Sequence, residues 1–253
     1  MNAIERRVSR VRHELKRRLL EVRAVERITP GFVRITLGGE DLAGYVSAGY
    51  DDHSKLFFPA PGKDRPEMEG APVMRDYTPR RYDAARGELV FEIALHGEGP
   101  ASDWAAGARL GQFLGVGGPR GSFVVEGDFD WYLLIGDESA LPAISRRLEE
   151  LPASARAVVV VEVADAGEER ELAAPAETTV YWVHRDKGQA LLEAVSGLEF
   201  PAGEPYAFVA CEGGVAKEIR RHLLEVRGLD KRWVKAAGYW RKGAVAVHDH
   251  LDD

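Results

Sequence analysis

The sequence has almost no cysteine and no long apolar segment. Cys211 is the only cysteine among 253 residues, which excludes an internal disulfide and a cluster of thiolates around a metal. An apolar run such as residues 157–161 is soon ended by Glu162 and is far too short to cross a bilayer. The first twenty residues are charged throughout and lack the apolar centre of a signal peptide. We therefore expect a cytoplasmic protein that does not insert into membranes and holds no metal ion of its own.

The charge of the chain is negative overall but positive at its start. The formal net charge is −7, which argues against general nucleic-acid binding. Residues 1–23 nevertheless carry eight Arg or Lys against three Glu. Apolar residues in this segment recur at helical spacing, at Ile4, Val8, Val11, Leu15 and Leu19. The pattern predicts a basic amphipathic helix over residues 1–21. Separately, we expect the protein to be a monomer.

The first half of the chain has the pattern of β structure. Short runs rich in β-branched and aromatic residues alternate with turns that contain Gly and Pro. Six such runs lie at residues 22–28, 32–37, 54–58, 76–81, 89–95 and 113–116. Short strands joined by turns predict a six-stranded antiparallel β-barrel, which forms a domain over residues 22–127.

The second half changes to an alternation of apolar strands and amphipathic helices. Strand-like runs lie at residues 131–135, 157–163, 179–184, 206–210 and 233–238. Helical patterns lie among them, at residues 141–151, 189–196 and 215–227. This alternation predicts an open parallel sheet, so we expect residues 128–253 to form a Rossmann-like α/β domain that binds a nucleotide.

One short stretch, Arg-Asp-Tyr-Thr-Pro-Arg at residues 75–80, combines the side chains that a flavin needs. A flavin ring packs on an aromatic surface, its polar edge needs a hydroxyl or amide, and its pyrophosphate needs cations. On a continuous strand Arg75 and Tyr77 share one face, and Thr78 and Arg80 share the other. The motif alone is equally typical of a surface strand, so it gains weight only from its neighbours.

A second stretch, residues 96–104, reads His-Gly-Glu-Gly-Pro-Ala-Ser-Asp-Trp. Its glycines allow a close approach of the backbone, and Pro100 suits the first position of a helix. The amides of Ala101 and Ser102, with the Ser102 hydroxyl, would face an anion at the helix N-terminus. We predict a diphosphate cradle directly after a strand of the barrel. Taken alone, His96 is more typical of a hydrogen-bonded structural residue than of an acid or base.

Nicotinamide should bind where the parallel strands of the second domain end. The first strand runs into residues 136–139, Gly-Asp-Glu-Ser, where the glycine permits close approach and the serine can hydrogen-bond. The fourth strand ends at residues 210–214, Ala-Cys-Glu-Gly-Gly, a second junction of small residues. Glu162 at the end of the second strand would suit a ribose hydroxyl, whereas His184 and Arg185 at the end of the third would suit a 2′-phosphate. NADH and NADPH therefore both remain open.

Residues 238–243, near the C-terminus, read Gly-Tyr-Trp-Arg-Lys-Gly. Two aromatic side chains followed by two cations could cover a flavin face and attract an anionic acceptor. A buried aromatic pair at the end of a strand explains the same residues equally well.

Taken together, these stretches resemble the siderophore-interacting protein family of ferric-siderophore reductases, within the wider group of ferredoxin-reductase-like flavoproteins. The matching pieces are residues 29–30, 52–56, 75–80, 96–104, 118–122, 136–144 and 238–243. They occur in the order of the family over nearly the whole chain. Each piece is weak singly, but the ordered set is specific.

The resemblance implies an FAD-binding barrel, a domain for NADPH or NADH, and a basic pocket for a ferric siderophore. It assigns FAD to Arg75, Tyr77, Thr78 and Arg80, with His96, Ala101 and Ser102 nearby. The remaining cofactor residues are expected to be Gly136, Asp137, Glu138, Ser139, Glu212 and Trp240. The resemblance assigns the siderophore to Lys55, Arg120, Arg241 and Lys242. No side chain is given a catalytic role, because the flavin carries the electrons.

Residues 210–212 depart from the family pattern. Family members commonly carry Ala-Gly-Glu where this chain has Ala-Cys-Glu. Because cysteine is bulkier than glycine, we expect Cys211 to crowd the nicotinamide. A reduced ferredoxin is therefore an alternative electron donor.

The resulting hypothesis is that NAD(P)H reduces FAD by hydride transfer and that the flavin delivers single electrons to Fe³⁺. Siderophores are hard, anionic oxygen donors that favour Fe³⁺, so reduction to Fe²⁺ releases the iron. Two alternatives stay open. One is a flavin-dependent electron-transfer reductase with a different acceptor, and the other is a non-enzymatic protein that binds ferric chelates.

Overall fold

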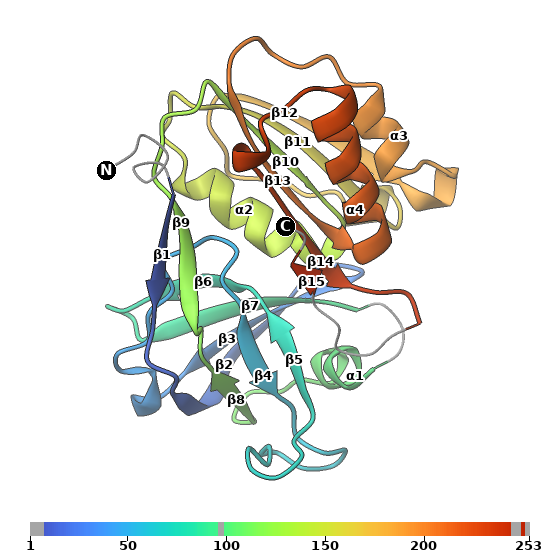
Figure 1. The fold of residues 1–253 in the computed structure, drawn as a ribbon. Helices are drawn as coiled ribbons and strands as arrows, with labels where there is room; N and C mark the ends of the chain where they lie inside the picture. The colour runs from blue at the N-terminus through green and yellow to red at the C-terminus, as the bar shows by residue number, and fades with distance from the viewer. Residues whose placement is uncertain (1–7, 96–98, 244–248, 251–253) are drawn as a thin grey trace. The chain divides into compact units, whose positions relative to one another are not determined.

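The computed structural model describes residues 8–95, 99–243 and 249–250. The chain divides into two compact units, Met1–Gly127 and Asp128–Asp253 (Figure 1). Each unit has a hydrophobic core of its own, so each one folds around apolar residues that it supplies itself.

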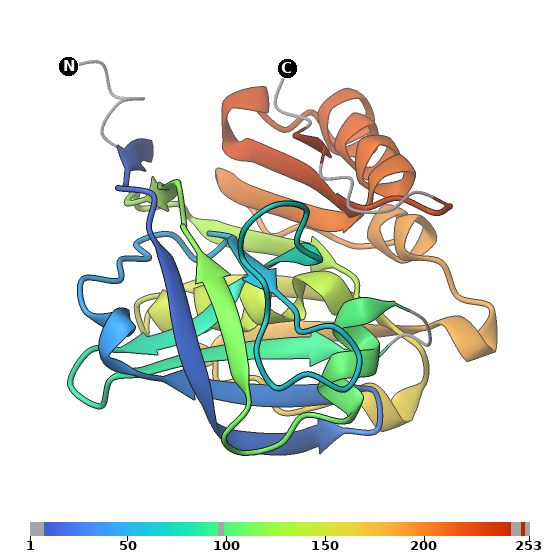
Figure 2. The same cartoon turned by 90° about the horizontal axis from the view of Figure 1, so that it is seen from below.

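The first unit is built on a seven-stranded antiparallel sheet. In spatial order its strands are β5 (Met74–Tyr77), β4 (Ser54–Phe57), β8 (Phe113–Gly117), β2 (Arg17–Thr29), β3 (Phe32–Gly38), β7 (Glu88–Ala94) and β6 (Pro79–Asp83). β1 (Val8–Arg12) and β9 (Gly121–Val125) form a separate two-stranded ribbon, drawn as two adjacent arrows in Figures 1 and 2. A helix α1 (Pro100–Ala106) and a 3₁₀ turn η1 (Glu40–Leu42) complete the unit.

The two edges of this sheet are joined by a single residue. β5 and β6 lie at opposite ends of the spatial order, yet only Thr78 separates them along the chain. Strands in a sheet are spaced about 4.8 Å apart, so a flat sheet of this size would hold its edges roughly 29 Å apart. The two peptide units around Thr78 span at most about 7 Å. The sheet must therefore curl until its edges meet, which confirms the barrel-like antiparallel fold.

The sheet has seven strands rather than six because residues 76–81, expected as one strand, belong to two. β5 pairs with β4, whereas β6 pairs with β7. Pro79 has no amide hydrogen to donate, and it stands at the start of an edge strand, where proline is tolerated. The expected alternation of faces across residues 75–80 therefore holds within β5 but does not continue through Thr78.

The prediction of a helix over residues 1–21 is wrong for the part that the structure describes. Residues 8–12 form β1, and β2 begins at Arg17. In β2 the buried positions alternate through Arg18, Leu20 and Val22, which is the period of a strand. Arg18 concealed this period, because an arginine at a core position reads as polar. Its guanidinium lies 5.2 Å from the centroid of the Tyr45 ring and is 4% exposed as a residue.

The second unit is an open sheet with the order β12-β11-β10-β13-β14-β15. The strands are β10 (Trp131–Gly136), β11 (Arg156–Val163), β12 (Glu177–His184), β13 (Pro205–Glu212), β14 (Val234–Trp240) and β15 (Asp249–His250). The first five run parallel, and β15 pairs antiparallel with β14. The chain moves outward from β10 to β12 and then returns to the other side of β10, as in a doubly wound α/β fold.

Helices cover both faces of this sheet. α3 (Leu191–Ser196) and α4 (Gly213–Arg221) pack on one face over a core that includes Leu133, Val160 and Val209, and α2 (Leu141–Glu150) lies on the other (Figure 1). α4 continues into a π turn, His222–Val226. The 3₁₀ turns are η2 (Glu138–Ala140), η3 (Ala166–Glu168), η4 (Arg185–Lys187) and η6 (Lys231–Trp233). Among the described residues, none of the helices has the length and apolarity that crossing a bilayer requires.

Candidate functional site

The predicted flavin motif lies where the edges of the curled sheet meet. Arg75 and Tyr77 belong to β5, Arg80 belongs to β6, and the buried Thr78 joins the two strands. On the β4–β5 ladder Arg75 is directly opposite Leu56, and side chains opposite each other share a face. Leu56 lies in the core, so Arg75 and Tyr77 belong to the inner face of the sheet at its edge. The fold therefore gathers these side chains at one junction.

Phe58 brings the two predicted flavin motifs together. Its ring lies edge-on to Tyr77, with centroids 6.3 Å apart and planes at 70°. The same ring lies edge-on to Trp104 of α1, at 5.7 Å and 63°. Contacts of this geometry are favourable, and they tie α1 to the end of β5. Phe58 was missed as a site residue, because a buried aromatic at the end of a strand carries no local signal of function.

The phenol of Tyr77 stays protonated at physiological pH. Burial raises the pKa of Tyr77 far above its ordinary value, and the neighbouring Arg75 cation lowers it only in part. A neutral phenol beside a guanidinium offers an aromatic surface, a hydrogen-bond donor and a positive charge within a few residues. These are the groups that a flavin ring and its diphosphate require.

Arg80 lies at an irregularity of the β6–β7 ladder. The register shifts between Pro79 and Arg81, which leaves Arg80 as an extra residue on β6, and such bulges re-aim side chains. Its side chain is 12% exposed, with Nε 3.5 Å from Oε1 of Glu92. The same oxygen, in a residue that is 2% exposed, accepts a hydrogen bond from Nη2 of Arg34 at 2.8 Å. Arg34 also pairs with Glu26, at 3.2 Å, so Arg80 shares Glu92 with a cation that already has a second carboxylate, and Arg80 keeps donors for a diphosphate.

Helix α1 begins where the second motif predicted a helix N-terminus. Gly99 precedes it with a φ of +130°, a conformation that favours glycine, and Pro100 is its first residue. Ala101 and Ser102 follow in the first turn and are buried. The N-cap residue offers no side-chain acceptor, so the first-turn amides receive no side-chain cap. His96 lies outside the described residues.

The buried polar groups of this unit fit an additional polar ligand. Thr78 is 6% exposed and Ser102 is 5% exposed. Within the described ranges the buried indole N–H of Trp104 has no hydrogen-bond partner. An unpaired buried polar group costs about 1–3 kcal/mol. A flavin nucleotide bound against β5 and α1 would supply an acceptor for this indole and polar atoms next to the two buried hydroxyls, so the residues present fit FAD.

Lys55, a predicted siderophore ligand, lies on the opposite face of β4. It stands directly across from Asp76, and its Nζ is 3.0 Å from both carboxylate oxygens. Because side chains alternate along a strand, this pair points away from the face that carries Arg75 and Tyr77. The Lys55 side chain is 42% exposed. Arg120 is exposed in the turn between β8 and β9.

In the second unit, Gly136 ends β10 at a close approach of the backbone. A Cβ atom there would lie 2.5 Å from Cβ of Ala140 and 2.7 Å from the carbonyl oxygen of Ala210. Only glycine lets the chain pass from β10 into η2 at this distance. The strand order reverses between β10 and β13, and open α/β sheets bind ligands outside the carboxyl ends of the strands at such a point.

Asp137, which is 4% exposed, is the centre of a hydrogen-bond network at this carboxyl edge. Its Oδ1 accepts hydrogen bonds from the amide and the hydroxyl of Ser139, at 2.9 and 2.5 Å. Its Oδ2 accepts hydrogen bonds from the Glu212 amide at 3.2 Å and from Nε1 of Trp240 at 2.8 Å. Burial raises the pKa of Asp137 to about 6, although the donors oppose this. The network brings together predicted cofactor residues from the ends of β10, β13 and β14.

Glu212 caps helix α4. Its Oε2 accepts the amides of Gly214 and Val215, at 2.6 and 3.0 Å, and its Oε1 accepts the amide of Lys242 at 3.4 Å. Desolvation raises the pKa of Glu212, but these three amides and the nearby Arg241 cation together lower it below its ordinary value. The side chains of Arg241 and Lys242 are exposed directly after β14. Glu212 therefore fixes the strand ends that present the two cations.

Arg185, at the end of β12, draws together two carboxylates from neighbouring strand ends. Its guanidinium contacts both oxygens of Glu138, with Nη1 2.8 Å from Oε2, and Nη1 is also 3.1 Å from Oε1 of Glu162. The hydrogen bonds to Glu138 and Glu162 raise the pKa of Arg185, which stays charged. Glu138, a predicted cofactor residue, is thus engaged with this cation. His184 is buried, and its Nε2 lies 2.7 Å from Oε1 of Glu169.

Cys211 does not crowd the carboxyl edge, contrary to the expectation from the sequence. It is 1% exposed and packs in the hydrophobic core with Val209, Ala216 and Ile219. Burial raises the pKa of the thiol far above its ordinary range, so it stays neutral and unreactive. Cys211 therefore gives no reason to expect a ferredoxin as the electron donor. The described part of the chain contains no group of three or more His, Cys, Asp or Glu placed to hold a metal ion.

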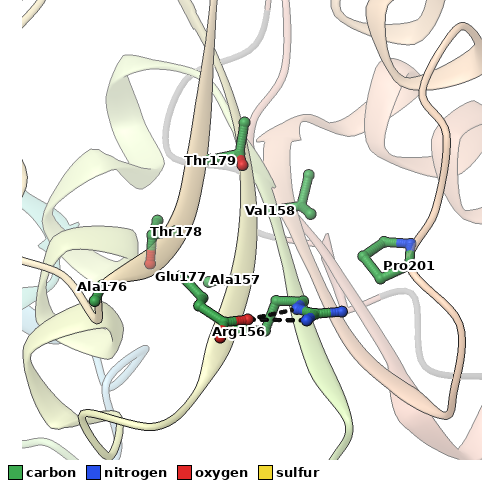
Figure 3. A pocket seen from close by; sticks show the side chains of 8 residues that line it. All are labelled: Arg156, Ala157, Val158, Ala176, Glu177, Thr178, Thr179 and Pro201. Carbon is green, nitrogen blue, oxygen red and sulfur yellow. Dashed lines mark hydrogen bonds and ion pairs between the residues drawn. The ribbon is translucent and has the colours of Figure 1, made fainter.

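A shallow hollow lies at the opposite end of the second unit's sheet. It has a volume of about 250 Å³ and is lined at the amino ends of β11 and β12 by Arg156, Ala157, Val158, Ala176, Glu177, Thr178 and Thr179, together with Pro201 (Figure 3). The dashed lines in Figure 3 mark the contact of Arg156 with Glu177, in which Nη2 of Arg156 lies 2.9 Å from Oε2 of Glu177. Because nucleotides bind at the carboxyl ends of parallel strands, this hollow is not the nicotinamide site.

The two units define a class of protein. An antiparallel barrel followed by a parallel α/β domain is a fold that this chain shares with a flavohemoglobin and with the ferredoxin reductase in carbazole 1,9a-dioxygenase, at 16% and 18% identity and TM-scores of 0.64 and 0.63. The family model "Siderophore-interacting FAD-binding domain" matches residues 21–123, and "Siderophore-interacting protein" matches residues 129–243. The chain belongs to the siderophore-interacting protein family, which confirms the resemblance found in its motifs.

Known relatives match nearly the full length of the chain. The NADPH-dependent ferric-chelate reductase of Escherichia coli (strain K12) is 40% identical over 95% of this chain and 99% of its own length. The ferric vibriobactin reductase ViuB of Vibrio cholerae is 34% identical over 89% of this chain and 90% of its own. The crystal structure of a siderophore utilization protein from T. fusca is 42% identical and has a TM-score of 0.88, covering 96% of this chain and 99% of that one.

Proposed function

We propose that this protein is an FAD-dependent ferric-siderophore reductase of the cytoplasm that takes its electrons from NADPH. Two relatives of nearly equal length are named ferric reductases, and one of them is named NADPH-dependent. The observation in the structure that supports the proposal most directly is the contact of Tyr77 and Trp104 with Phe58, because it joins the two flavin motifs. A single, buried Cys211 suits a reducing compartment.

The first unit would hold FAD with side chains from β5, β6 and α1. Tyr77 offers a surface for the ring, and the buried hydroxyl of Thr78 can pair with its polar edge. Arg75 and Arg80 supply positive charge for the diphosphate, and the first turn of α1 at Ser102 supplies amides. Bound FAD would supply the chemistry that the side chains lack, since it takes a hydride from NADPH and passes the electrons singly to Fe³⁺.

The second unit would bind NADPH at the carboxyl ends of its strands. Gly136 leaves room for a close approach to the backbone, and Trp240, a residue that is 45% exposed, offers a planar surface. Arg185 has a side chain that is 44% exposed, so its cation is accessible to a 2′-phosphate, which NADH lacks. Glu138 and Glu162 hold this guanidinium in place at the ends of neighbouring strands.

The exposed cations of the chain would attract the ferric siderophore. Lys55, Arg120, Arg241 and Lys242 all lie at the surface, and siderophore complexes with hard oxygen donors are commonly anionic. When Fe³⁺ becomes Fe²⁺ the metal loses charge and with it much of its preference for hard oxygen ligands, so the iron dissociates. The protein's part is therefore to neutralise the chelate and hold it, while no side chain needs to transfer a proton.

An anaerobic assay with purified protein, NADPH, a ferric siderophore and a chromogenic Fe²⁺ chelator tests this function. The proposal predicts the visible absorption of oxidised flavin, its bleaching by NADPH and its recovery on addition of ferric siderophore. Parallel assays with NADH and with reduced ferredoxin rank the donors. Faster reduction of quinones or proteins than of ferric chelates would favour a different acceptor. A colourless protein that binds the siderophore without reducing it would favour a binding protein.

A further inference from the structure

The carboxylate of Asp137 has no acceptor site left for a ligand. A carboxylate offers about four lone-pair positions. Ser139 occupies two of them through its amide and hydroxyl, the Glu212 amide occupies a third, and the Trp240 indole occupies the fourth. Asp137 is also 4% exposed, whereas the indole that it holds belongs to a residue that is 45% exposed. The carboxylate therefore faces the protein, and the ring that it anchors faces outward.

From this geometry we propose that Asp137 is a positioning residue, which binds no nucleotide itself but fixes the Trp240 ring for the nicotinamide dinucleotide. The proposal rests on the proposed function for the identity of the nucleotide. It differs from the expectation that Asp137 binds the cofactor directly.

The anchor is needed because Trp240 is the last residue of β14. It pairs with Glu212 at a point where the β13–β14 register shifts, so the ladder alone holds its backbone irregularly. An exposed aromatic side chain at a strand end can occupy several rotamers, and ordering it on binding would cost free energy. A hydrogen bond from the indole N–H to a buried carboxylate selects one orientation before the ligand arrives.

Several charged groups surround this carboxylate and set its ionisation. Glu138 follows it in the chain and disfavours the charged form. From β13, the Cys211 thiol stays neutral, while Glu212 is held as an anion by the α4 amides. Arg241 directly follows β14, and its cation lowers the pKa of Glu212. Asp137 is ionised above about pH 6, where its bond to the indole is charge-assisted.

The same unit contains a matched control. Nε1 of Trp233 donates a hydrogen bond to Oε1 of Glu204 at 3.0 Å, at the start of β13 and β14 rather than at their ends. Glu204→Gln removes the carboxylate from an indole–carboxylate hydrogen bond of the same kind. This bond lies beside the same two strands but at their amino ends, away from the carboxyl edge. Asp137→Asn makes the corresponding change at the network described above.

The experiment is a ¹⁹F NMR titration of holoprotein labelled with 5-fluorotryptophan. The sequence contains five tryptophans, and Trp240→Phe assigns the signal of interest. We expect the Trp240 signal of the wild type to shift with a midpoint near pH 6, the pKa of Asp137. The shift is expected to vanish in Asp137→Asn and to persist in Glu204→Gln. A Trp240 signal that titrates in Asp137→Asn as it does in the wild type overturns the proposal.

Kinetics provide the second readout. Asp137→Asn is expected to raise the KM for NADPH about tenfold, the loss expected for one hydrogen bond to a charged group, while FAD content stays at the wild-type value. Glu204→Gln is expected to leave both unchanged. An unchanged KM in folded Asp137→Asn overturns the proposal. If the protein reduces no ferric chelate at all, the proposed function fails, but the ¹⁹F titration still decides whether Asp137 holds Trp240.

A further measurement covers the case in which Asp137→Asn does not fold. In Trp240→Phe the aromatic ring is retained but the N–H donor is lost. Carboxyl ¹³C NMR should then show a higher pKa for Asp137 than in the wild type, because one donor that stabilises the anion is missing. An Asp137 pKa that is the same in both proteins would show that the indole is not bound, and the proposal would be wrong.

Discussion

Lys55 and Asp76 face each other directly across β4 and β5, and the lysine Nζ lies 3.0 Å from each carboxylate oxygen. An exposed pair of this kind contributes at most about 1 kcal/mol to stability, so it is easily opened by a competing anion. An anionic chelate can therefore replace Asp76 as the partner of the Lys55 ammonium group.

Opposite substitutions of this pair are predicted to have opposite effects. Lys55→Ala should lower kcat/KM for an anionic ferric siderophore about three- to tenfold, and Asp76→Asn should raise it, because the cation is removed in one and released in the other. Both variants should keep their FAD. Lys63→Ala, which removes another exposed lysine of the same unit, serves as the control. If Lys55→Ala lost FAD and chelate reduction in equal measure, the assigned role would be wrong.

The junction of β5 and β6 is predicted to govern flavin binding. Arg75→Ala removes a cation beside Tyr77 and should weaken FAD binding by at least tenfold, since charge-assisted hydrogen bonds to phosphate are among the strongest. The ratio of flavin absorbance to protein absorbance after gel filtration measures this. Arg86→Ala is a suitable control, because Arg86 pairs with Glu88 at an exposed turn of the same sheet. Full FAD occupancy in Arg75→Ala at micromolar protein would contradict the site.

Asp137 is predicted to make the protein less stable as the pH rises. Its folded-state pKa of about 6 lies above the ordinary 3.8, so the folded state binds this proton more tightly than the unfolded chain does. The stabilisation is fully present below about pH 4 and is lost as the pH rises through 6, by about 3 kcal/mol at roughly 1.4 kcal/mol per pKa unit.

Urea unfolding of the wild type and Asp137→Asn at several pH values isolates this contribution. The free energy of unfolding of the wild type, minus that of the variant, should fall between about pH 4 and pH 7, because the asparagine does not titrate. A difference that stays constant across this range would show that the Asp137 pKa is not raised.

Arg185 is predicted to distinguish NADPH from NADH. Arg185→Ala leaves Glu138 and Glu162 without their shared cation, so a 2′-phosphate would meet two carboxylates. The KM for NADPH should rise at least tenfold, while that for NADH should change little. Arg156→Ala breaks a similar pair with Glu177 at the amino ends of β11 and β12, and it should change neither. If Arg185→Ala raised the KM for NADPH and the KM for NADH equally, Arg185 would have only a structural role.

The α/β unit follows closely from the sequence for a physical reason. Its central strands β10 and β13 are covered by helices on both faces, so they appear as continuous apolar runs between helical patterns. Gly136 could be recognised as a place of close backbone approach from its position between strand and helix. The inward direction of the Cys211 side chain could not be recognised from the sequence, because it depends on which face of β13 packs against α4.

The barrel unit was harder to predict because its strands pair with distant partners. Arg18 occupies an inward position and covers the Tyr45 ring, so the strand period was hidden behind a polar residue. The break at Thr78 arises from closure of the sheet, which no local pattern encodes. The motif around Arg75 and Tyr77 was visible, but its contact through Phe58 with α1 required the fold.

The proposed function requires electrons to pass from NADPH through a bound flavin to ferric iron. The most direct measurement is an anaerobic titration that follows flavin absorbance, NADPH absorbance and trapped Fe²⁺ together in one cuvette with a ferric siderophore. We predict a yellow protein that yields about two Fe²⁺ for each NADPH consumed, because a hydride carries two electrons and each ferric ion accepts one. A protein that carries FAD and oxidises NADPH, yet forms no Fe²⁺ above the rate without enzyme, would contradict the account.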